Sequence, residues 1–342
     1  MVVIGGNTHG TPRRAKVGPP DRMTLPQPTP RIVPSKSVKL CYTLMHVAET
    51  AGIRELADGE YKPHDKTLED GIDRQINYLL DQVGCTQPGF RLLDIGCGYG
   101  RLLRKAKARG AQTVGVNISA EQVNYCREQG LQVYCCTYRD LLESPEWHGQ
   151  FDGVIANGSL EHWVQPEDVK AGKMNEIYNE SFAIAHKVMD PDVPDTRYVT
   201  TALHVKHALD PEDLLMPWYR LPHRSNRRQF SLLHHWFSGY YPVLGQLEVC
   251  AKPFFILEKE VDGTLGYKRA SEYRMTRMRR GLYTNPKLVW GIVKALTRHP
   301  YTTATSLVGY FIEQAWDWQF RGKEPPTTLL RQTWKRNAPV PL

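Results

Sequence analysis

The 342-residue sequence predicts an α/β fold whose central β-sheet is mostly parallel. The first observation is that short apolar runs alternate with single helical patterns between residues 90 and 203. Such a rhythm is typical of parallel strands joined by helical crossovers. The second is composition, since 41% hydrophobic and 23% charged residues are ordinary for a folded domain, and no apolar run is as long as a membrane span. We therefore expect one large domain with extra segments around it.

Two segments precede the expected sheet. Residues 1–36 are rich in proline and lack periodicity, which predicts a disordered tail. The pattern then turns helical over residues 37–83. Ile72, Ile76 and Leu79, for example, repeat at helical spacing. We interpret this second segment as an N-terminal helical flap of the folded domain.

The sheet region contains seven strand-like segments. Helices are expected between them, from Leu102 to Arg109, from the capping residue Ser119 onward, and over residues 177–188. The expected strands are Phe90–Ile95, Thr113–Val116, Leu131–Cys135, Phe151–Ala156, Arg197–Leu203, Phe254–Val261 and Trp316–Phe320.

The regular rhythm ends after the fifth strand. Residues 205–245 are rich in Trp, Tyr, His and Arg and are punctuated by prolines, which predicts an irregular cap rather than a further domain. A basic helix is expected later, around Arg274 and Arg280. These boundaries place the folded domain at residues 37–322 and a C-terminal tail at residues 323–342.

The net charge of +8 is concentrated at the N-terminus. Residues 1–40 contain seven Lys or Arg and one Asp, which gives +6. Three interpretations remain open for this basic segment: a solvated tail, an arm that contacts anionic membranes or acidic partners, and an organelle transit peptide. No nucleic-acid partner is expected, because most of the excess charge lies in the tail and no recognition module is found.

Seven scattered cysteines form no C-x-x-C pair. This pattern predicts reduced thiols and a cytoplasmic protein, with any membrane contact confined to the periphery. No cluster has the spacing of a metal site, so no metal is expected. The sequence makes no prediction of the oligomeric state.

The most informative motif is a glycine turn that follows the first strand, in which Asp94 precedes Gly96, Gly98 and Gly100. Glycines allow positive φ and let a ligand approach the main chain, and N–H groups of the following helix can meet its polar part. The Lys-Ser/Thr pair of a phosphate-binding P-loop is missing. Asp94 suits an ammonium group rather than a pyrophosphate. A plain tight turn is the alternative interpretation.

This turn resembles motif I of the class I methyltransferases, which have a Rossmann-like fold with a seven-stranded, mostly parallel sheet. Residues 115–122 are similar to the next motif of the cyclopropane-fatty-acid synthase and mycolic acid methyltransferase family, and the resemblance continues over residues 137–141 and 151–162. It implies an enzyme with S-adenosylmethionine as cofactor. The implied cofactor-binding residues are Asp94, Gly96, Gly98, Gly100, Asn117, Gln122, Thr137, Tyr138 and Gly158.

The same resemblance implies a catalytic group. In this family a Glu after the fourth strand, a His after the fifth and a later Tyr gather around a bound bicarbonate that acts as base. The matching residues here are Glu161, His204 and Tyr267, with His162 beside Glu161 and Tyr273 as the rival of Tyr267.

The expected reaction is methyl transfer to an unsaturated lipid or prenyl-like carbon, with Glu161 assisting proton removal. The family's upstream Tyr-Ser-Cys-x-Tyr run corresponds to residues 57–61, which lack the Cys, so methylation is expected rather than cyclopropane formation. The alternative is an N- or S-methyltransferase for a small polar, carboxylate-bearing metabolite, because the arginines of residues 220–228 could meet an acidic group. A non-enzymatic relative is disfavoured because the motif residues are intact.

Overall fold

The computed structural model describes residues 23–28 and 36–337, and within them seven strands form one sheet with the order β3-β2-β1-β4-β5-β7-β6. The first five strands are parallel, and β7 pairs antiparallel with both β5 and β6. The predicted fold class is confirmed. The strands are β1 (Arg91–Ile95), β2 (Gln112–Asn117), β3 (Val133–Cys135), β4 (Gly153–Asn157), β5 (Arg197–Val205), β6 (Phe255–Asp262) and β7 (Thr327–Arg336).

Helices follow the strands as the sequence pattern predicts. Ser119 begins α4 by accepting a hydrogen bond from the Gln122 N–H, and Thr67 begins α2 in a reciprocal capping box with Asp70. The helices around the sheet are α1 (Lys36–Glu49), α2 (Leu68–Gln82), α3 (Arg101–Ala108), α4 (Ala120–Glu128), α5 (Tyr138–Leu142), α6 (Pro166–Lys170) and α7 (Met174–Val188), with the 3-10 turns η1 (Pro145–Trp147) and η2 (Leu160–His162).

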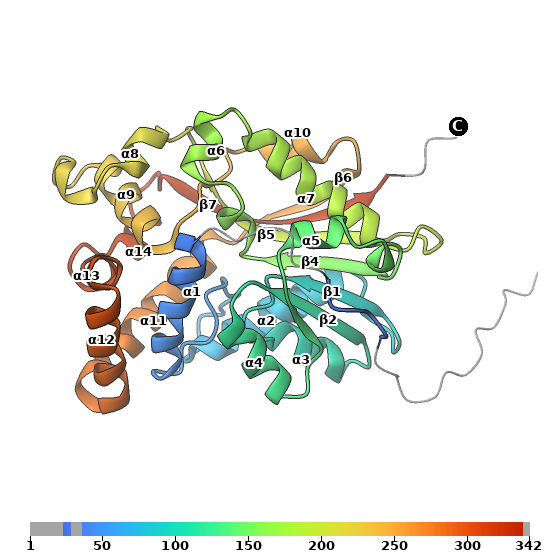
Figure 1. Cartoon of the computed structure of the whole chain (residues 1–342), viewed down its shortest axis with the longest axis horizontal. Helices are drawn as coiled ribbons and strands as arrows, with labels where there is room; N and C mark the ends of the chain where they lie inside the picture. Colours follow the sequence, from blue (N-terminus) through green and yellow to red (C-terminus); the bar gives the residue numbers. More distant parts are fainter. Residues whose placement is uncertain (1–22, 29–35, 338–342) are drawn as a thin grey trace, which may run out of the picture.

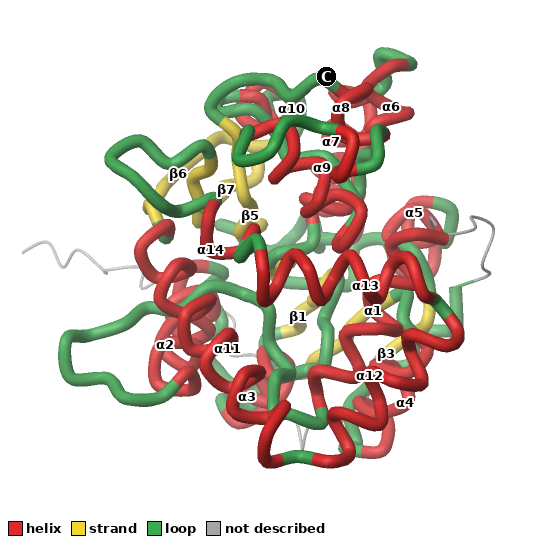
Figure 2. Tube along the Cα trace, turned by 90° about the vertical axis from the view of Figure 1, so that its left-hand side faces the viewer, coloured by secondary structure: helices red, strands yellow, loops and turns green. Residues whose placement is uncertain are grey.

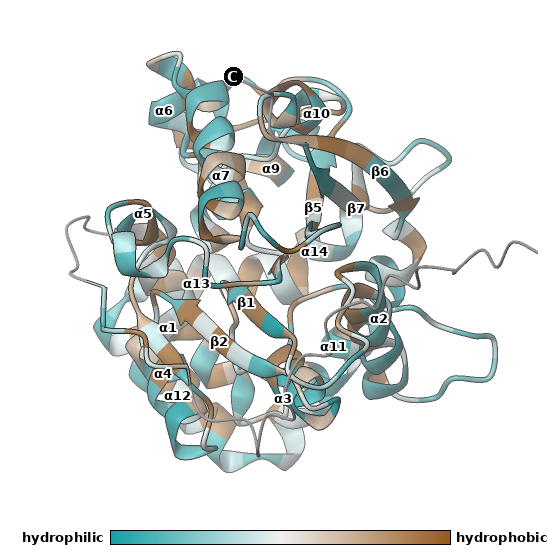
Figure 3. Cartoon of the chain, turned by 90° about the vertical axis from the view of Figure 1, so that its right-hand side faces the viewer, coloured by the Kyte–Doolittle hydropathy of each residue, from teal (hydrophilic) through white to brown (hydrophobic). Residues whose placement is uncertain are grey.

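The core lies between the sheet and these helices. Phe182 of α7 packs edge-on against Tyr198 of β5 and Trp334 of β7, and all three side chains are buried. Figure 3 shows hydrophobic residues along the inner strands β1 and β5, while α4 and α6 present mostly hydrophilic residues. Burial of such large aromatic side chains stabilises the stacked layers.

A larger helical cap than predicted covers one side of the sheet. Figure 1 shows α1, α11, α12 and α13 together on its left, and Figure 2 shows α1, α12 and α13 in front of β1 and β3. The cap elements are α8 (Pro211–Leu215), η3 (Trp218–Arg220), α9 (Asn226–Phe237), α11 (Thr264–Thr284), α12 (Pro286–Arg298), α13 (Pro300–Leu307), the π-helical turn η4 (Val308–Ile312) and α14 (Ala315–Trp318). The remaining helix, α10 (Gln246–Ala251), packs on α7 and β6.

The C-terminal prediction is wrong in two respects. The segment 316–320, expected to be the last strand, contains the end of helix α14, because Trp316 and Phe320 are four residues apart and face one core. The segment 323–342, expected to be a tail, contains β7. Its strand pairs along nine residues with β5, so this segment is a central part of the sheet.

The N-terminal segment differs from the prediction where it is described. Residues 23–28 lie against β3: the Tyr134 hydroxyl donates to the Leu25 carbonyl at 2.6 Å, and Trp147 Nε1 donates to the Pro26 carbonyl at 3.2 Å. This stretch is therefore ordered by contacts with the sheet edge. The rest of the predicted tail, residues 1–22 and 29–35, lies outside the described residues.

Candidate active site

The glycine turn borders a cleft at the carboxyl ends of β1 and β2. Gly96, Gly98 and Gly100 have φ angles of 82°, 52° and 72°, in the left-handed region that favours glycine. A Cβ at Gly96 would lie 2.7 Å from the Ser159 Cβ, whereas a Cβ at Gly98 would meet no atom within 4 Å. Gly98 therefore faces open space, as close approach of a ligand to the main chain requires.

The cleft encloses about 1180 Å³ of empty space, open mouth included. Helix α1 covers it, and the His46 Nδ1 and Tyr99 hydroxyl, 2.9 Å apart, join α1 to the glycine turn. Val38 and Tyr42 of α1 line the cleft, a contribution that the sequence reasoning missed. Six of the predicted cofactor residues also line it: Gly96, Gly98, Asn117, Gln122, Thr137 and Tyr138.

Two amide side chains at the end of β2 face the cleft. Asn117 Nδ2 donates to Gln122 Oε1 at 2.7 Å, so the two side chains hold each other in place. Amides carry donors and acceptors together, which suits the hydroxyl groups of a ribose. Both residues were expected to contact the cofactor, and the hydrogen bond between them was not predicted from the sequence.

Asp94 and Gly100 line neither this cleft nor the cavity next to it. Asp94 is nevertheless buried directly before the turn, and its Oδ1 has no hydrogen-bond partner among the described residues. Burial, followed by the nearby Glu55 carboxylate, raises the pKa of Asp94 to about 8. A buried carboxylate with an unpartnered oxygen is stabilised by a cation, and an ammonium group would be one.

A second cavity of about 470 Å³ adjoins the cleft, since Tyr42 and His162 line both spaces. Gly158, predicted to contact the cofactor, lines this second cavity instead of the cleft. Glu161 and Tyr267 line it as well. The structure therefore brings Glu161, His162 and Tyr267 together beside the cleft.

Glu161 is held on η2 with its carboxylate buried. Its Oε1 accepts a hydrogen bond from the Leu203 N–H at 2.8 Å, and its Oε2 has no partner in the described part of the chain. Burial, and then the carboxylate of Asp58, raise the pKa of Glu161 to about 7. A carboxyl group with such a pKa exchanges protons near neutral pH.

The neighbouring backbone packs tightly on this residue. Gly239 follows α9 with φ of 94°, and a Cβ there would lie 2.1 Å from the Glu161 carbonyl oxygen. Glycine is therefore required where the turn after α9 crosses η2. This crossing fixes Glu161 against the cap.

The two histidines and the tyrosine have different positions. Burial lowers the pKa of His162 to about 4, so its ring is neutral, and burial raises the pKa of Tyr267 well above its ordinary value, so its hydroxyl stays protonated. His204 is not among the residues that line the second cavity, whereas Thr201 and Leu203 are. Alternation along β5 places His204 on the other face of the sheet. The structure therefore does not bring His204 into the cavity that Glu161 lines.

Sequence reasoning missed a second carboxylate in this cavity. Asp58 lines it, and its two oxygens accept hydrogen bonds from Gln75 Nε2 at 2.8 Å and Arg331 Nε at 2.6 Å. Gln75 also donates to Asn157 Oδ1 at 2.9 Å. Asp58 belongs to the loop of residues 57–61, where the family Cys is missing. Its partner Arg331 lies on β7, so no local pattern could have linked the two.

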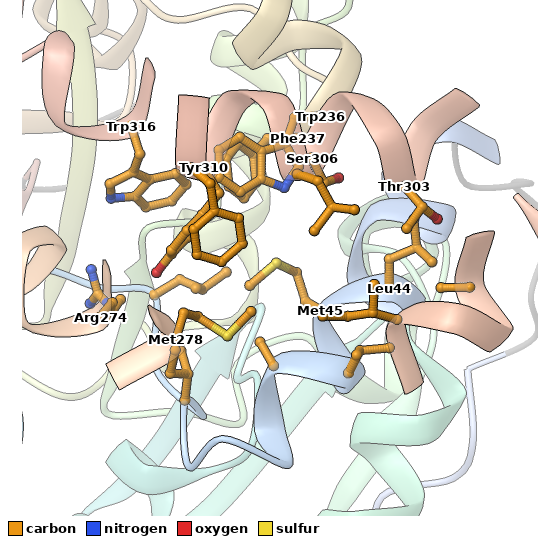
Figure 4. A pocket seen from close by; sticks show the side chains of 18 residues that line it. Leu44, Met45, Trp236, Phe237, Arg274, Met278, Thr303, Ser306, Tyr310 and Trp316 are labelled. Carbon is orange, nitrogen blue, oxygen red and sulfur yellow. The ribbon is translucent and has the colours of Figure 1, made fainter. Parts of the chain in front are cut away.

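A third, apolar cavity begins where the second one ends, because Leu56, Phe237 and Trp316 line both. It encloses about 730 Å³ of empty space, open mouth included. Figure 4 shows the rings of Trp316, Phe237 and Tyr310 near one another, with Met45 and Met278 facing the same space. We call the second cavity, which Asp58 and Glu161 line, the carboxylate cavity. The cleft, the carboxylate cavity and the apolar cavity thus follow one another in space.

One buried cation lines the apolar cavity. Arg274 donates from Nε to the Glu55 carbonyl at 2.8 Å and from a terminal nitrogen to the Ala57 carbonyl, while its Nη1 has no partner in the described ranges. Figure 4 shows this side chain at one end of the cavity. In the described segments no group of three or more His, Cys, Asp or Glu side chains gathers as a metal site would require.

Solved structures share this architecture over most of the chain. The cyclopropane synthase MmaA2 from Mycobacterium tuberculosis gives a TM-score of 0.68 at 18% identity and covers 89% of this chain and 99% of that one. Geranyl diphosphate methyltransferase, in complex with S-adenosylmethionine, gives 0.53 at 20% identity, with 84% and 100% covered. The fold is that of a class I methyltransferase. Within this methyltransferase fold, the glycine turn stands between β1 and α3.

Sequence comparison supports the same assignment over part of the chain. Residues 58–212 match the sequence model of the family described as mycolic acid cyclopropane synthetase. A Mycobacterium tuberculosis protein named "Probable fatty acid methyltransferase" is 39% identical over 104 residues, 28% of this chain and 23% of that protein. Cyclopropane mycolic acid synthase MmaA2 of the same species is 28% identical over 135 residues, 39% and 43% of the two chains. The predicted resemblance is confirmed, although the matches span less than half of these relatives.

Proposed function

We propose that the protein is an S-adenosylmethionine-dependent methyltransferase that methylates a carbon of an unsaturated lipid or prenyl-like acceptor. The observation that carries this proposal is the series of three cavities. The polar cleft leads through Tyr42 and His162 to the carboxylate cavity, and this leads through Trp316 to the apolar cavity. A cofactor, a reacting carbon and an apolar chain would fit these spaces in that order.

The following observations support binding of the cofactor in the cleft. Asp94 does not itself line the cleft, but it directly precedes Ile95, which does, and its unpartnered Oδ1 would pair with the ammonium of the methionine moiety. The Asn117–Gln122 amides would meet the ribose hydroxyls. Gly98 leaves the main chain open to the ligand. The bound cofactor supplies a methyl group on a sulfonium centre. Tyr42 and His162 line both the cleft and the second cavity, and the passage between them would direct this methyl group toward the acceptor. Such a transfer requires the sulfur, the methyl carbon and the acceptor carbon to lie in line.

The second cavity suits the charge changes of an alkene acceptor. The π electrons of the alkene would form the new carbon–carbon bond as the bond between the methyl group and the sulfonium sulfur breaks, and the neighbouring alkene carbon would become cationic. Aromatic faces such as Tyr241, Tyr267 and Trp316 line the cavity and stabilise a cation. The unpartnered Oε2 of Glu161 would then accept the proton that restores the double bond.

The third cavity favours a lipid over a small polar metabolite. Its lining is mostly apolar, and the unpartnered Arg274 Nη1 offers one site for an oxygen-bearing group of an amphiphile. By contrast, two of the four arginines that suggested a carboxylate-bearing metabolite are engaged elsewhere: Arg227 pairs with Asp213, and Arg228 with Glu313. None of the four lines one of the three cavities. No observation favours that alternative.

The location of the protein is also part of this proposal. Among the described residues no helix is both long and apolar enough to cross a bilayer. All seven cysteines are free, in keeping with the predicted cytoplasmic compartment. The proposed membrane contact of the basic N-terminal segment falls largely on residues outside the described ranges.

The decisive experiment is mass spectrometry of total lipid and water-soluble extracts incubated with the protein and methyl-labelled S-adenosylmethionine. We expect the label on an unsaturated lipid or prenyl chain. The Glu161→Gln variant serves as the matched control, because it keeps the shape of the site and loses its base. Label that appeared only in water-soluble amines or acids would contradict the lipid proposal.

A further inference from the structure

Helix α12 carries an exposed apolar stripe that the proposed reaction does not use. The exposed fractions of Val289, Trp290 and Val293 are 40%, 60% and 42%. Val293 lies four residues after Val289 and three after Trp290, so the three side chains share one side of the helix. Leu288 and Ala295 are buried on the opposite side. The outward stripe of α12 is unusual, because contiguous apolar surface on a protein normally marks an interaction site.

A row of cations accompanies this stripe. Lys287, Lys294 and Arg298 are exposed and repeat at helical spacing along α12, next to the apolar residues. The Lys294 ammonium lies 5.5 Å from the centre of the Trp290 ring, which ties the two rows together. An amphipathic helix with Trp on one side and Lys or Arg beside it is typical of a surface that lies in a lipid headgroup layer. We call Lys287, Val289, Trp290, Val293, Lys294 and Arg298 the α12 surface.

The charge around this surface is one-sided. Residues 273–312 contain seven Lys or Arg and no Asp or Glu, so this stretch alone carries +7. Arg277 pairs with Glu69, but the three cations of the α12 surface form no ion pair with any described residue. Unpaired cations attract an anionic surface over a Debye length. A second copy of the chain fits poorly, because a twofold contact would bring the same cations face to face.

The inner side of α12 connects this surface to the site. Ile292 and Ala295 line the apolar cavity, so one helix has cations and Trp290 outside and the cavity wall inside. Figure 1 places α12 at the outer edge of the cap, away from the β6 edge of the sheet, and Figure 2 shows it at the front of that side. From this arrangement we propose that the α12 surface docks on an anionic lipid bilayer and holds the apolar cavity at the membrane. This inference rests on the proposed lipid acceptor only to explain what the docking would be for. The binding to the bilayer itself does not depend on that proposal.

The test measures co-sedimentation of the full chain with vesicles of phosphatidylcholine and phosphatidylglycerol, without cofactor. The wild-type protein is expected to bind these vesicles, to bind phosphatidylcholine vesicles weakly, and to be released by salt. The charge variant Lys287→Gln/Lys294→Gln/Arg298→Gln should lose on the order of 100-fold in partitioning, because each cation near an anionic surface contributes roughly fivefold. The apolar variant Trp290→Ser/Val293→Ser should lose at least about tenfold.

Matched controls carry the same substitutions on other exposed positions. Lys62→Gln/Lys66→Gln/Lys107→Gln removes three exposed cations elsewhere, and Val249→Ser/Ile256→Ser removes two exposed apolar side chains near the β6 edge. Both controls should partition within about twofold of the wild type, apart from a small general charge effect. Thermal melting of all variants shows that each one folds.

Three results would overturn the inference. The first is that both α12 variants bind the vesicles as strongly as the wild type. Membrane contact would then be assigned to the basic N-terminal segment, which all variants retain. The second is an equal loss in the controls, which would mean general electrostatic attraction. The third is a dimer in analytical ultracentrifugation that the apolar variant dissociates without any change in vesicle binding. Since no turnover is measured, a failed lipid-methylation assay leaves this result untouched, and the two proposals fail separately.

Discussion

Replacing Glu161 by Gln is expected to lower turnover and, at alkaline pH, to raise stability. Burial and the Asp58 carboxylate raise the pKa of Glu161 from 4.5 to about 7. A carboxyl group whose pKa is raised in the folded state favours folding while it is protonated, below its unfolded value, and loses that contribution as pH rises through the folded value. The wild type therefore loses stability between about pH 4.5 and 7, and the neutral Gln does not.

The size of this effect follows from the pKa. A rise from 4.5 to about 7 corresponds to about 3 kcal/mol between the two protonation states. The Gln side chain keeps an acceptor for the Leu203 N–H but places a donor where Oε2 has no partner, which costs about 1–2 kcal/mol. We therefore expect the variant to be more stable than the wild type by about 1–2 kcal/mol at pH 8, and no more stable near pH 4.5.

Activity should change in the opposite direction. If Glu161 accepts the proton, wild-type kcat rises with pH through about 7, and Glu161→Gln loses roughly 10²–10⁴-fold in kcat with unchanged cofactor affinity. The assays are denaturant unfolding at several pH values, methyl-transfer kinetics and calorimetry on one preparation. Glu128→Gln, at an exposed position on α4, is the control and should change none of these. Unimpaired turnover, or lower stability together with weaker cofactor binding, would refute the reasoning.

Three further predictions concern the backbone. Gly98→Val should abolish S-adenosylmethionine binding in calorimetry. The control Gly130→Val, at a glycine with φ of 72° and equally open space around it, should only reduce stability. Equal effects of the two substitutions on binding would contradict the cleft assignment. Gly239→Ala should lower Tm and turnover, because its Cβ would lie 2.1 Å from the Glu161 carbonyl oxygen; an unchanged Tm would show that this crossing is loose. Removing residues 1–22 should leave Tm unchanged. Removing residues 1–28 should lower the free energy of unfolding by about 1–2 kcal/mol, because the hydrogen bonds to Tyr134 and Trp147 are lost. Equal melting curves for the two truncated proteins would contradict the docking of residues 23–28.

The parallel half of the fold could be predicted because its signal is local. β1 and β4 are short apolar runs buried on both faces, and the glycines and Ser119 mark where the following helices begin. The cofactor cleft followed from the same signals, since its residues stand directly after these strands. Glu161 was found through the family resemblance, at a position that follows the end of β4 and lies on η2.

The remaining features depend on contacts between distant segments. Only Leu329, Leu330 and Trp334 of β7 are apolar, without a regular period, so the sequence does not predict an inner strand. Its polar residues Arg331 and Gln332 are buried because Asp58 of the 57–61 loop and Glu260 of β6 accept their hydrogen bonds. Trp316 and Phe320 are as aromatic as a strand, but their spacing belongs to a helix. His204 was grouped with Glu161 on the resemblance alone, and the sequence does not show on which face of β5 its side chain lies.

The position of β7 has a consequence for how the protein is made. The strand lies between β5 and β6 and delivers Arg331 to Asp58, 273 residues earlier in the chain. β5 and β6 leave the ribosome before β7, and until β7 follows each of them presents an unpaired edge and Asp58 lacks its guanidinium partner. Emergence of residues 327–336 must therefore complete both the sheet and the cavity that Asp58 lines, and until then the nascent chain is prone to pairing with its neighbours.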